Sequence, residues 1–407
     1  MKIQTSWLRD ERGLAFLSYG FRPFFFAGAL YSGLAIAIWM PVYTGEWTLD
    51  TAFVPLDWHI HEMLFGVLPA VIAGFLLTAI PNWTGRPPVR GNLLLLMFVT
   101  WVLGRAAVAY SGQIGWFAAM LIDASFLLLT GAVAAREVLA AGNIRNMRVV
   151  ALVLLLFACN VAFHLEAHAR GAADYSVRAG VAAIIVLVSV IAGRIVPAFT
   201  KNWLMRRPQG PMPVPFSRFD VVAVLFGALA LAAWVIRPEG MPTSGLCLAA
   251  GLLHGVRLVR WAGYRTWSSP ILVILHIGYA FVPLGFVLAT LSAAELVSVS
   301  AAIHAWMAGG AGIMILAVMS RASLGHSGRP LVASASTQAV YVLVIAAALA
   351  RVAAALVPAW SNGLIYLAAT CWSLSFLGFA LSYAPMFLAV RLDARTPPPQ
   401  ASMPSRH

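Results

Sequence analysis

The sequence predicts an all-α, polytopic transmembrane helical bundle of about twelve spans, with both termini in the cytoplasm. Of the 407 residues, 61% are hydrophobic and only 10% are charged, and the mean hydropathy is +0.86, which no ordinary soluble domain of this length would show. Apolar runs of about 20 residues, the length that crosses a bilayer as a helix, recur between short polar breaks. Runs such as ALVLLLFACNVAF do not alternate apolar and polar residues, so the pattern favours helices over a transmembrane β-barrel.

Charged residues and Pro/Gly clusters mark the breaks between the predicted spans. The spans are predicted near residues 22–41, 58–81, 92–110, 116–136, 148–168, 178–199, 219–236, 244–262, 270–291, 296–320, 335–357 and 361–390. They form a single transmembrane domain over residues 22–391, preceded by a cytoplasmic segment, 1–21, and followed by a cytoplasmic tail, 392–407. The longest polar break, near 200–218, is Pro-rich and suggests two halves of six helices each.

Lysine and arginine are concentrated in alternate breaks, and this pattern sets the predicted topology. One set of breaks holds most of the basic residues, whereas the other holds only Arg170, Arg178 and Arg237. Because loops rich in Lys and Arg stay in the cytoplasm, we expect the first set, which includes both termini, to be cytoplasmic and the number of spans to be even. The formal net charge of +13 is therefore attributed to loops that set topology and not to binding of nucleic acid.

The three cysteines lie far apart inside apolar runs, at Cys159, Cys247 and Cys371. No CxxC pair and no CxxCH haem-attachment signature occurs in the sequence. Disulfides, zinc fingers and covalently attached haem are therefore not expected.

Seven of the nine histidines fall in or at the ends of predicted spans, where polar groups are costly and ask for a reason. Five of them share the outer half of the predicted bundle: His59, His61, His164, His168 and His304. His254 lies near mid-depth in the eighth span and His276 in the inner half of the ninth. A hydrogen bond to a neighbouring helix explains the position of each of these two histidines as well as a role as a metal ligand does.

The spacing of the outer histidines separates them further. His164 and His168 are four residues apart on one helix face, where two imidazoles can chelate one metal. His168 is nearest the water, and a place in the headgroup zone explains it equally well. His59 and His61 are two residues apart, about 200° around a regular helix, so we expect them to point at different partners.

The tenth span combines an imidazole with a thioether, because His304 and Met307 are three residues apart on one face. This pairing would suit copper, and neutral imidazoles from facing helices also suit haem iron. The small residues of MAGGAGIM let a helix or a flat cofactor approach closely. Glu62 and Glu166 could be interface acids in contact with solvent, or could orient a ligand imidazole or pass protons.

Three arginines fall within or at the ends of spans, at Arg105, Arg194 and Arg351. A charge at this depth is costly unless it pairs, snorkels or faces a cavity. Snorkelling or a structural ion pair is the simplest interpretation of each.

Six strings together resemble the NnrS family of bacterial membrane proteins, in the same order from Phe21 to Leu331. They are FRPFFFAGAL, WHIHEMLFG, GFLLTAIPNWTGRPP, GRIVPAFTKNWL, LHIGYAFVPLG and AVMSRASLGHSGRPL. Members of that family are described as haem- and copper-containing proteins of the cytoplasmic membrane, produced with the nitric-oxide response of denitrifying bacteria. The resemblance therefore implies haem b, copper, nitric oxide as ligand or substrate, and a role in tolerance of nitrosative stress.

The resemblance also implies site residues, position by position. The family's motif histidines match His59, His61, His164, His276, His304 and His326. Polar positions of the same strings, all near the cytoplasmic side, match Asn82, Trp83, Arg86, Arg194, Lys201, Asn202 and Arg329. These polar residues could bind haem propionates, an anion or one another. His168 and His254 lie outside the strings.

Two functional hypotheses follow from different classes of protein. The first is a b-type haem protein with copper that binds or turns over nitric oxide, or protects iron centres from it. No adjacent histidine pair and no H-x(3–4)-Y accompanies His304, unlike the haem–copper oxidoreductases, so catalysis stays open. The alternative is a transporter of copper, haem or a small anion with a histidine-lined path. A third and simpler hypothesis is a structural membrane scaffold.

Overall fold

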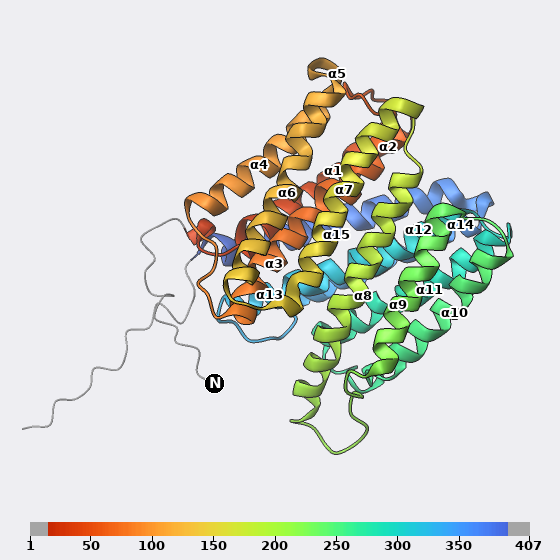
Figure 1. The fold of residues 1–407 in the computed structure, drawn as a ribbon. Helices are drawn as coiled ribbons and strands as arrows, with labels where there is room; N and C mark the ends of the chain where they lie inside the picture. The colour runs from red at the N-terminus through yellow and green to blue at the C-terminus, as the bar shows by residue number, and fades with distance from the viewer. Residues whose placement is uncertain (1–14, 390–407) are drawn as a thin grey trace, which may run out of the picture.

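A computed structural model describes residues 15–389, which fold into a bundle of long helices joined by short loops (Figure 1). No β-strand occurs within this described range. The predicted tail, 392–407, and most of the predicted N-terminal segment, 1–21, lie outside the described residues. The predicted all-α class is confirmed.

The helices follow the predicted spans closely and extend several of them. The α-helices are α1 (Phe21–Tyr43), α2 (Pro55–His61), α3 (Leu68–Thr84), α4 (Asn92–Ala109), α5 (Ser111–Ile114), α6 (Trp116–Ala140), α7 (Met147–Arg170), α8 (Tyr175–Leu204), α9 (Arg218–Ile236), α10 (Met241–Val259), α11 (Pro270–Ala293), α12 (Val299–His304), α13 (Met314–His326), α14 (Ala335–Leu356) and α15 (Ser361–Leu388). Two π-helical segments, η3 (Glu62–Val67) and η6 (Ala305–Ile313), connect α2 to α3 and α12 to α13. Short 3₁₀ turns lie at Ala15–Leu17, Ile144–Asn146, Gly263–Arg265 and Pro358–Trp360.

Within residues 15–389, eleven helical segments are long and apolar enough to cross a membrane, so this is a multi-pass membrane protein. Pro55–Thr84 and Val299–His326 each count as one continuous segment. The predicted eighth span corresponds to α10, which is not among the eleven, because polar residues such as His254 and Arg257 lower its hydropathy. This helix nevertheless packs between α9 and α11 as a member of the bundle.

The first helix, α1, and the last helix, α15, run in opposite directions and pack against each other, so that the start of α1 lies beside the end of α15. Nη1 of Arg22, at the start of α1, donates to the carbonyls of Phe387 (3.3 Å) and Ala389 (2.5 Å), at the end of α15. Trp372 Nε1 of α15 donates to Ser32 Oγ of α1 at 3.0 Å. The chain therefore enters and leaves the bundle at the same end, as an even number of crossings requires. We call this end the inner end, following the predicted topology, and the opposite end the outer end.

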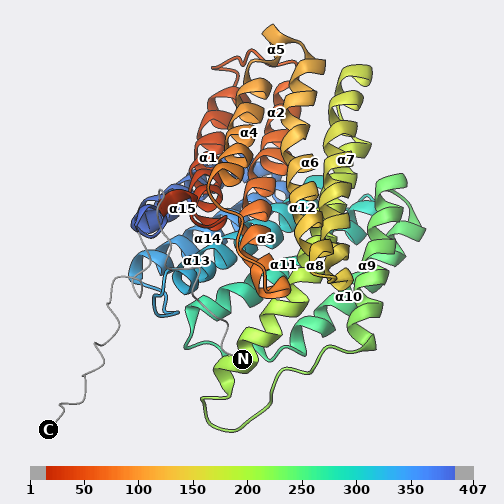
Figure 2. The same ribbon diagram turned by 60° about the vertical axis from the view of Figure 1, so that its left-hand side comes forward.

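Each π-helical segment begins directly after a histidine of the outer half. Segment η3 follows His61, and η6 follows His304. A π-helical turn is rare and often marks a functional site, because its extra residue changes the direction of the side chains around it. Helix α6 packs against both α4 and α7 (Figure 2), and α4 also contacts η3.

Candidate metal centre and adjoining cavity

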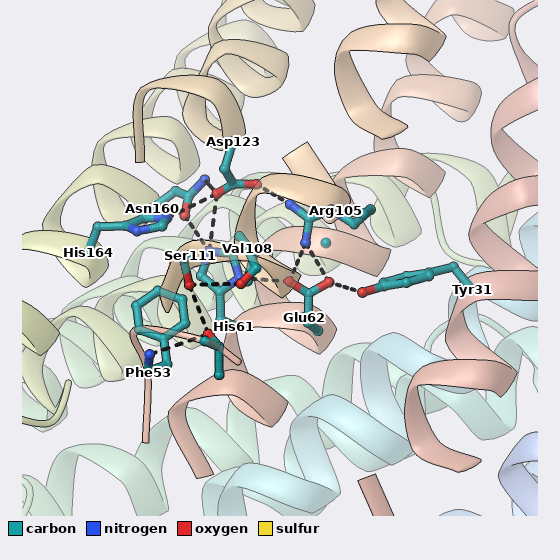
Figure 3. A network of polar contacts seen from close by, with 12 residues as sticks. Tyr31, Phe53, His61, Glu62, Arg105, Val108, Ser111, Asp123, Asn160 and His164 are labelled. Atoms are coloured by element: carbon teal, nitrogen blue, oxygen red, sulfur yellow. Dashed lines mark hydrogen bonds and ion pairs between the residues drawn. The ribbon is translucent and has the colours of Figure 1, made fainter. Parts of the chain in front are cut away.

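Three buried side chains from three helices converge near the outer end of the bundle. His61 of α2 and His164 of α7 approach one carboxylate, Asp123 of α6, with Nε2 to Oδ2 distances of 3.1 and 3.2 Å (Figure 3). One potential ligand atom from each residue lies within 4.8 Å of the other two. The exposed fractions are 0%, 2% and 2% for His61, Asp123 and His164. Two imidazoles and a carboxylate on separate helices are a common donor set for transition metals.

Asn160 holds this cluster together from one helical turn before His164. Its Nδ2 donates to Asp123 Oδ2 at 2.8 Å, and its Oδ1 accepts from His61 Nε2 at 3.1 Å. Asn160 and His164 lie four residues apart and therefore share one face of α7. The amide thus fixes both the carboxylate and one imidazole.

A second carboxylate and an arginine extend the cluster. Glu62 Oε1 lies 3.2 Å from His61 Nδ1, and both Glu62 oxygens accept from Arg105 Nη1, at 2.7 and 2.6 Å. Arg105 Nη2 donates to Asp123, and the hydroxyl of Tyr31 donates to Glu62. Figure 3 shows Arg105 placed between the two acids. The arginine therefore bridges both carboxylates through one guanidinium, as its fork of donors allows.

The charges of this buried cluster do not balance by themselves. Glu62 and Asp123 contribute two negative charges, and Arg105 contributes one positive charge. With neutral imidazoles one negative charge remains, which is costly in a medium of low dielectric constant. A cation at the imidazoles, either a proton or a metal ion, offsets this remaining negative charge. The residues present therefore fit a bound metal ion in both donor chemistry and charge.

A glycine makes the arginine bridge sterically feasible. Gly66 of η3 lies so close to Arg105 and Glu62 that an added Cβ would overlap the guanidinium. Its carbonyl accepts from Trp101 Nε1 at 2.9 Å, which ties η3 to α4.

His59 faces away from this cluster, as the two-residue spacing predicts. Its ring stacks on Trp39 of α1, with centroids 4.6 Å apart and planes 15° apart. It lines a cavity of about 370 Å³ that is also lined by His304 and Met307. Most of the remaining wall is apolar, and the size is within the usual range for ligand pockets, about 300–1,000 Å³.

His304 and an arginine supply the polar groups of this cavity. Nδ1 of His304 donates to the carbonyl of Ser300 at 2.8 Å, so the lone pair is on Nε2, the arrangement found in metal-ligating histidines. Arg351 of α14 lines the same cavity and donates to Ser300 Oγ at 3.2 Å. Among residues 15–389, no carboxylate forms an ion pair with Arg351. The cavity thus combines two imidazoles with a guanidinium that lacks a counter-charge in this part of the chain.

The other predicted histidines lie outside both sites. His168 stacks on Trp116, with ring centroids 4.1 Å apart, near the outer end of α7. His276 Nε2 lies 2.9 Å from Thr200 Oγ1, in the inner half. His254 Nδ1 lies 2.8 Å from the hydroxyl of Tyr279, which also accepts from Arg257. His326, predicted in a loop, is the last residue of α13, and its ring contacts Tyr19 and Phe21.

Glu166 serves a different part of the chain from Glu62. Its carboxylate accepts from the backbone amides of Tyr175 and Ser176, at 3.0 and 2.8 Å, and so stabilises the start of α8. Glu62 belongs to the metal cluster described above.

The polar residues predicted near the cytoplasmic side lie at the inner end and not at either site. Arg86 pairs with Glu137 at 2.6 Å. Arg194 donates to Asn146 Oδ1 at 3.0 Å. Asn82 and Trp83 lie in the last turn of α3, and Arg329 follows α13.

Asp123 and Asn160 were not predicted as site residues from the sequence, and Arg105 was attributed to snorkelling or pairing. Two signals could have found them. Asp123 is an acid inside an apolar run, which is by default a candidate functional residue in a membrane. Asn160 lies one turn from His164 and so had to share its face.

The comparisons with known proteins agree with the motif resemblance. The family described as NnrS protein matches residues 15–391 of this chain. No curated protein matches the chain. Because the family match covers nearly the whole sequence, the chain belongs to the NnrS family.

Proposed function

We propose that this protein binds copper and haem b in the bacterial cytoplasmic membrane and acts in the response to nitric oxide. The observation that supports this most is the division of the outer histidines between two sites. His61 and His164 meet at Asp123, whereas His59 and His304 line the apolar cavity. Segment η3, which starts directly after His61, contributes to both sites: Glu62 contacts His61, and Met63 and Leu64 line the cavity.

The cluster of His61, Asp123 and His164 is the proposed copper site. Imidazole nitrogen and carboxylate oxygen suit a divalent transition metal, and Asn160 and Glu62 supply the outer hydrogen bonds that orient such ligands. The burial of all three ligands favours a resident ion over a solvent-lined transport path.

The cavity is the proposed haem site. Its imidazoles come from two segments, α2 and α12, and either of them would hold the haem iron. The guanidinium of Arg351 has the right charge to bind a propionate. Trp39, stacked on His59, restricts the rotation of that imidazole. When bound, haem iron supplies a centre that binds nitric oxide, and copper supplies a second redox-active metal.

Metal analysis and visible spectra of purified variants test this proposal. His61→Ala and His164→Ala should lose copper and keep the Soret band, whereas His59→Ala and His304→Ala should lose the Soret band and keep copper. His168→Ala is the matched control on α7, because this ring contacts neither site. Wild-type protein that contains neither metal, or a His61→Ala variant that retains full copper, would refute the assignment.

A cellular assay tests the biological role. A deletion strain that expresses the His61→Ala or His304→Ala variant should grow more slowly under a nitric-oxide donor than one that expresses His168→Ala. Equal growth of all three strains, at equal protein levels, would contradict a role in nitric-oxide tolerance.

A further inference from the structure

A recess at the inner end of the bundle collects basic and amide side chains that neither site uses. It has a volume of about 650 Å³ and is lined by Trp83, Asn143, Arg145 and Asn146, among others. Arg194 of α8 donates to Asn146 Oδ1 at 3.0 Å and so borders the recess. We call the group formed by Trp83, Asn143, Arg145, Asn146, Arg148 and Arg194 the inner basic recess.

Hydrogen bonds between loops place this recess at the inner end. The amide of Gly91 donates to the carbonyl of Leu17, just before α1, so the α3–α4 loop lies beside the entry of the chain. Asn143 Nδ2 donates to the carbonyl of Trp83 at 2.7 Å, which brings the α6–α7 loop to the same level. The recess therefore lies at the inner end of the bundle, on the side where the chain enters α1 and leaves α15.

The arginines of the recess differ from their neighbours in having no acid beside them. Arg86 and Arg136 share the carboxylate of Glu137, with N to O distances of 2.6 Å each. By contrast, Arg145, Arg148 and Arg194 form no ion pair with any carboxylate in residues 15–389. The charges of Arg145 and Arg148 lie close enough to act on Arg194. Three like charges around one recess repel one another unless an anion binds among them.

Two other features of the recess favour an anion at the lipid surface. Helix α7 begins at Met147, so its positive dipole end lies next to the three arginines. Trp83 lies in the last turn of α3, at the inner end of the bundle, and tryptophan is enriched at membrane–water interfaces. Clusters of Arg on the cytoplasmic side, in pockets between helices, bind the headgroups of anionic lipids.

We propose that the inner basic recess binds the phosphate of an anionic membrane lipid. The three guanidinium groups supply the charge, the amides of Asn143 and Asn146 supply further hydrogen-bonding groups, and Trp83 covers the adjoining glycerol region. The site is separate from the copper and haem sites and does not depend on them.

Native mass spectrometry of the full-length, metal-loaded protein tests the proposal. Delipidated protein is titrated with phosphatidylglycerol or with phosphatidylcholine of identical acyl chains. We expect the wild type to bind phosphatidylglycerol at least about tenfold more tightly. The triple variant R145Q/R148Q/R194Q should lose this preference, and the preference of the wild type should weaken as salt is raised.

The control variant also removes three positive charges from the inner end of the molecule. K201Q/R206Q/R207Q changes three basic residues at the end of α8 and just beyond it, outside the recess. It should keep the preference for phosphatidylglycerol. Equal loss in both triple variants, or no loss in R145Q/R148Q/R194Q, would overturn the proposal.

Two further measurements keep the test decisive. Inorganic phosphate at millimolar concentration should not displace the lipid; displacement would identify a soluble anion as the occupant and refute the lipid assignment. If the triple variant does not fold, Arg145→Glu reverses one charge at an exposed position and should still reduce the preference. An unchanged preference in a folded Arg145→Glu protein would count against the recess.

Discussion

Replacing Asn160 with alanine tests the metal centre through a residue that is not itself one of its three ligands. The change removes the hydrogen bond that Asn160 Nδ2 donates to Asp123 Oδ2 at 2.8 Å. Because the acceptor is a charged carboxylate, this loss is about 2 kcal/mol. This corresponds to about a 30-fold weaker copper affinity, because 1.4 kcal/mol is about tenfold. The value lies within the range of about 10- to 100-fold seen for outer partners of metal ligands.

The assay is a competition titration of copper between the metal-free protein in detergent and a chromophoric chelator. The haem spectrum, recorded on the same sample, should not change, because Asn160 does not line the cavity. Asn143→Ala, which removes a hydrogen bond to Trp83 at the inner end, is the matched control. Unchanged copper affinity in Asn160→Ala, or an equal loss in Asn143→Ala, would refute the reasoning.

Three further substitutions test the arginine bridge and the cavity. Arg105→Gln should lower the free energy of unfolding by about 3–5 kcal/mol, because two carboxylates stay buried without their cation. Thermal unfolding measures this, and adding Asp123→Asn should recover part of the loss; a purely additive double variant would contradict the pairing. Gly66→Ala should cost about 1–3 kcal/mol because its Cβ overlaps Arg105, whereas Gly245→Ala, with nothing within 4 Å, should not destabilise. Arg351→Gln should reduce the haem retained through purification, with Arg351→Lys intermediate; full retention in Arg351→Gln would exclude its role with a propionate.

Hydropathy, together with the charged residues and Pro/Gly clusters that mark the breaks, predicted the helices, because crossing a bilayer imposes a length and a composition on each segment. The opposite directions of His59 and His61 were also predictable, since they depend only on the turn of one helix. For Glu62 the sequence left open contact with solvent or orientation of an imidazole, and its Oε1 lies 3.2 Å from His61 Nδ1. Each of these features depends only on the sequence of a single segment of the chain.

The features that sequence reasoning missed depend on which helices are neighbours. Asp123 comes to His61 from α6, and Arg351 comes to His304 from α14. Hydropathy does not encode these pairings, so the sequence placed the outer histidines at a similar depth but did not show which of them meet at the metal cluster and which line the cavity. The π-helical winding after His61 and His304 likewise has no local signal in composition.

The contact between the first and last helices determines the order in which the two sites can assemble. The metal cluster and its partners use residues between Tyr31 and His164 only, so all of them have been synthesised when α7 is complete. The cavity also needs Trp372 of α15, which bonds to α1 across 340 residues of chain. During synthesis from the N-terminus, the cavity therefore stays open on one side until the last helix has inserted. Its ligand can be enclosed only after α15 has been synthesised and inserted, whereas the metal ligands can meet as soon as α7 is in place.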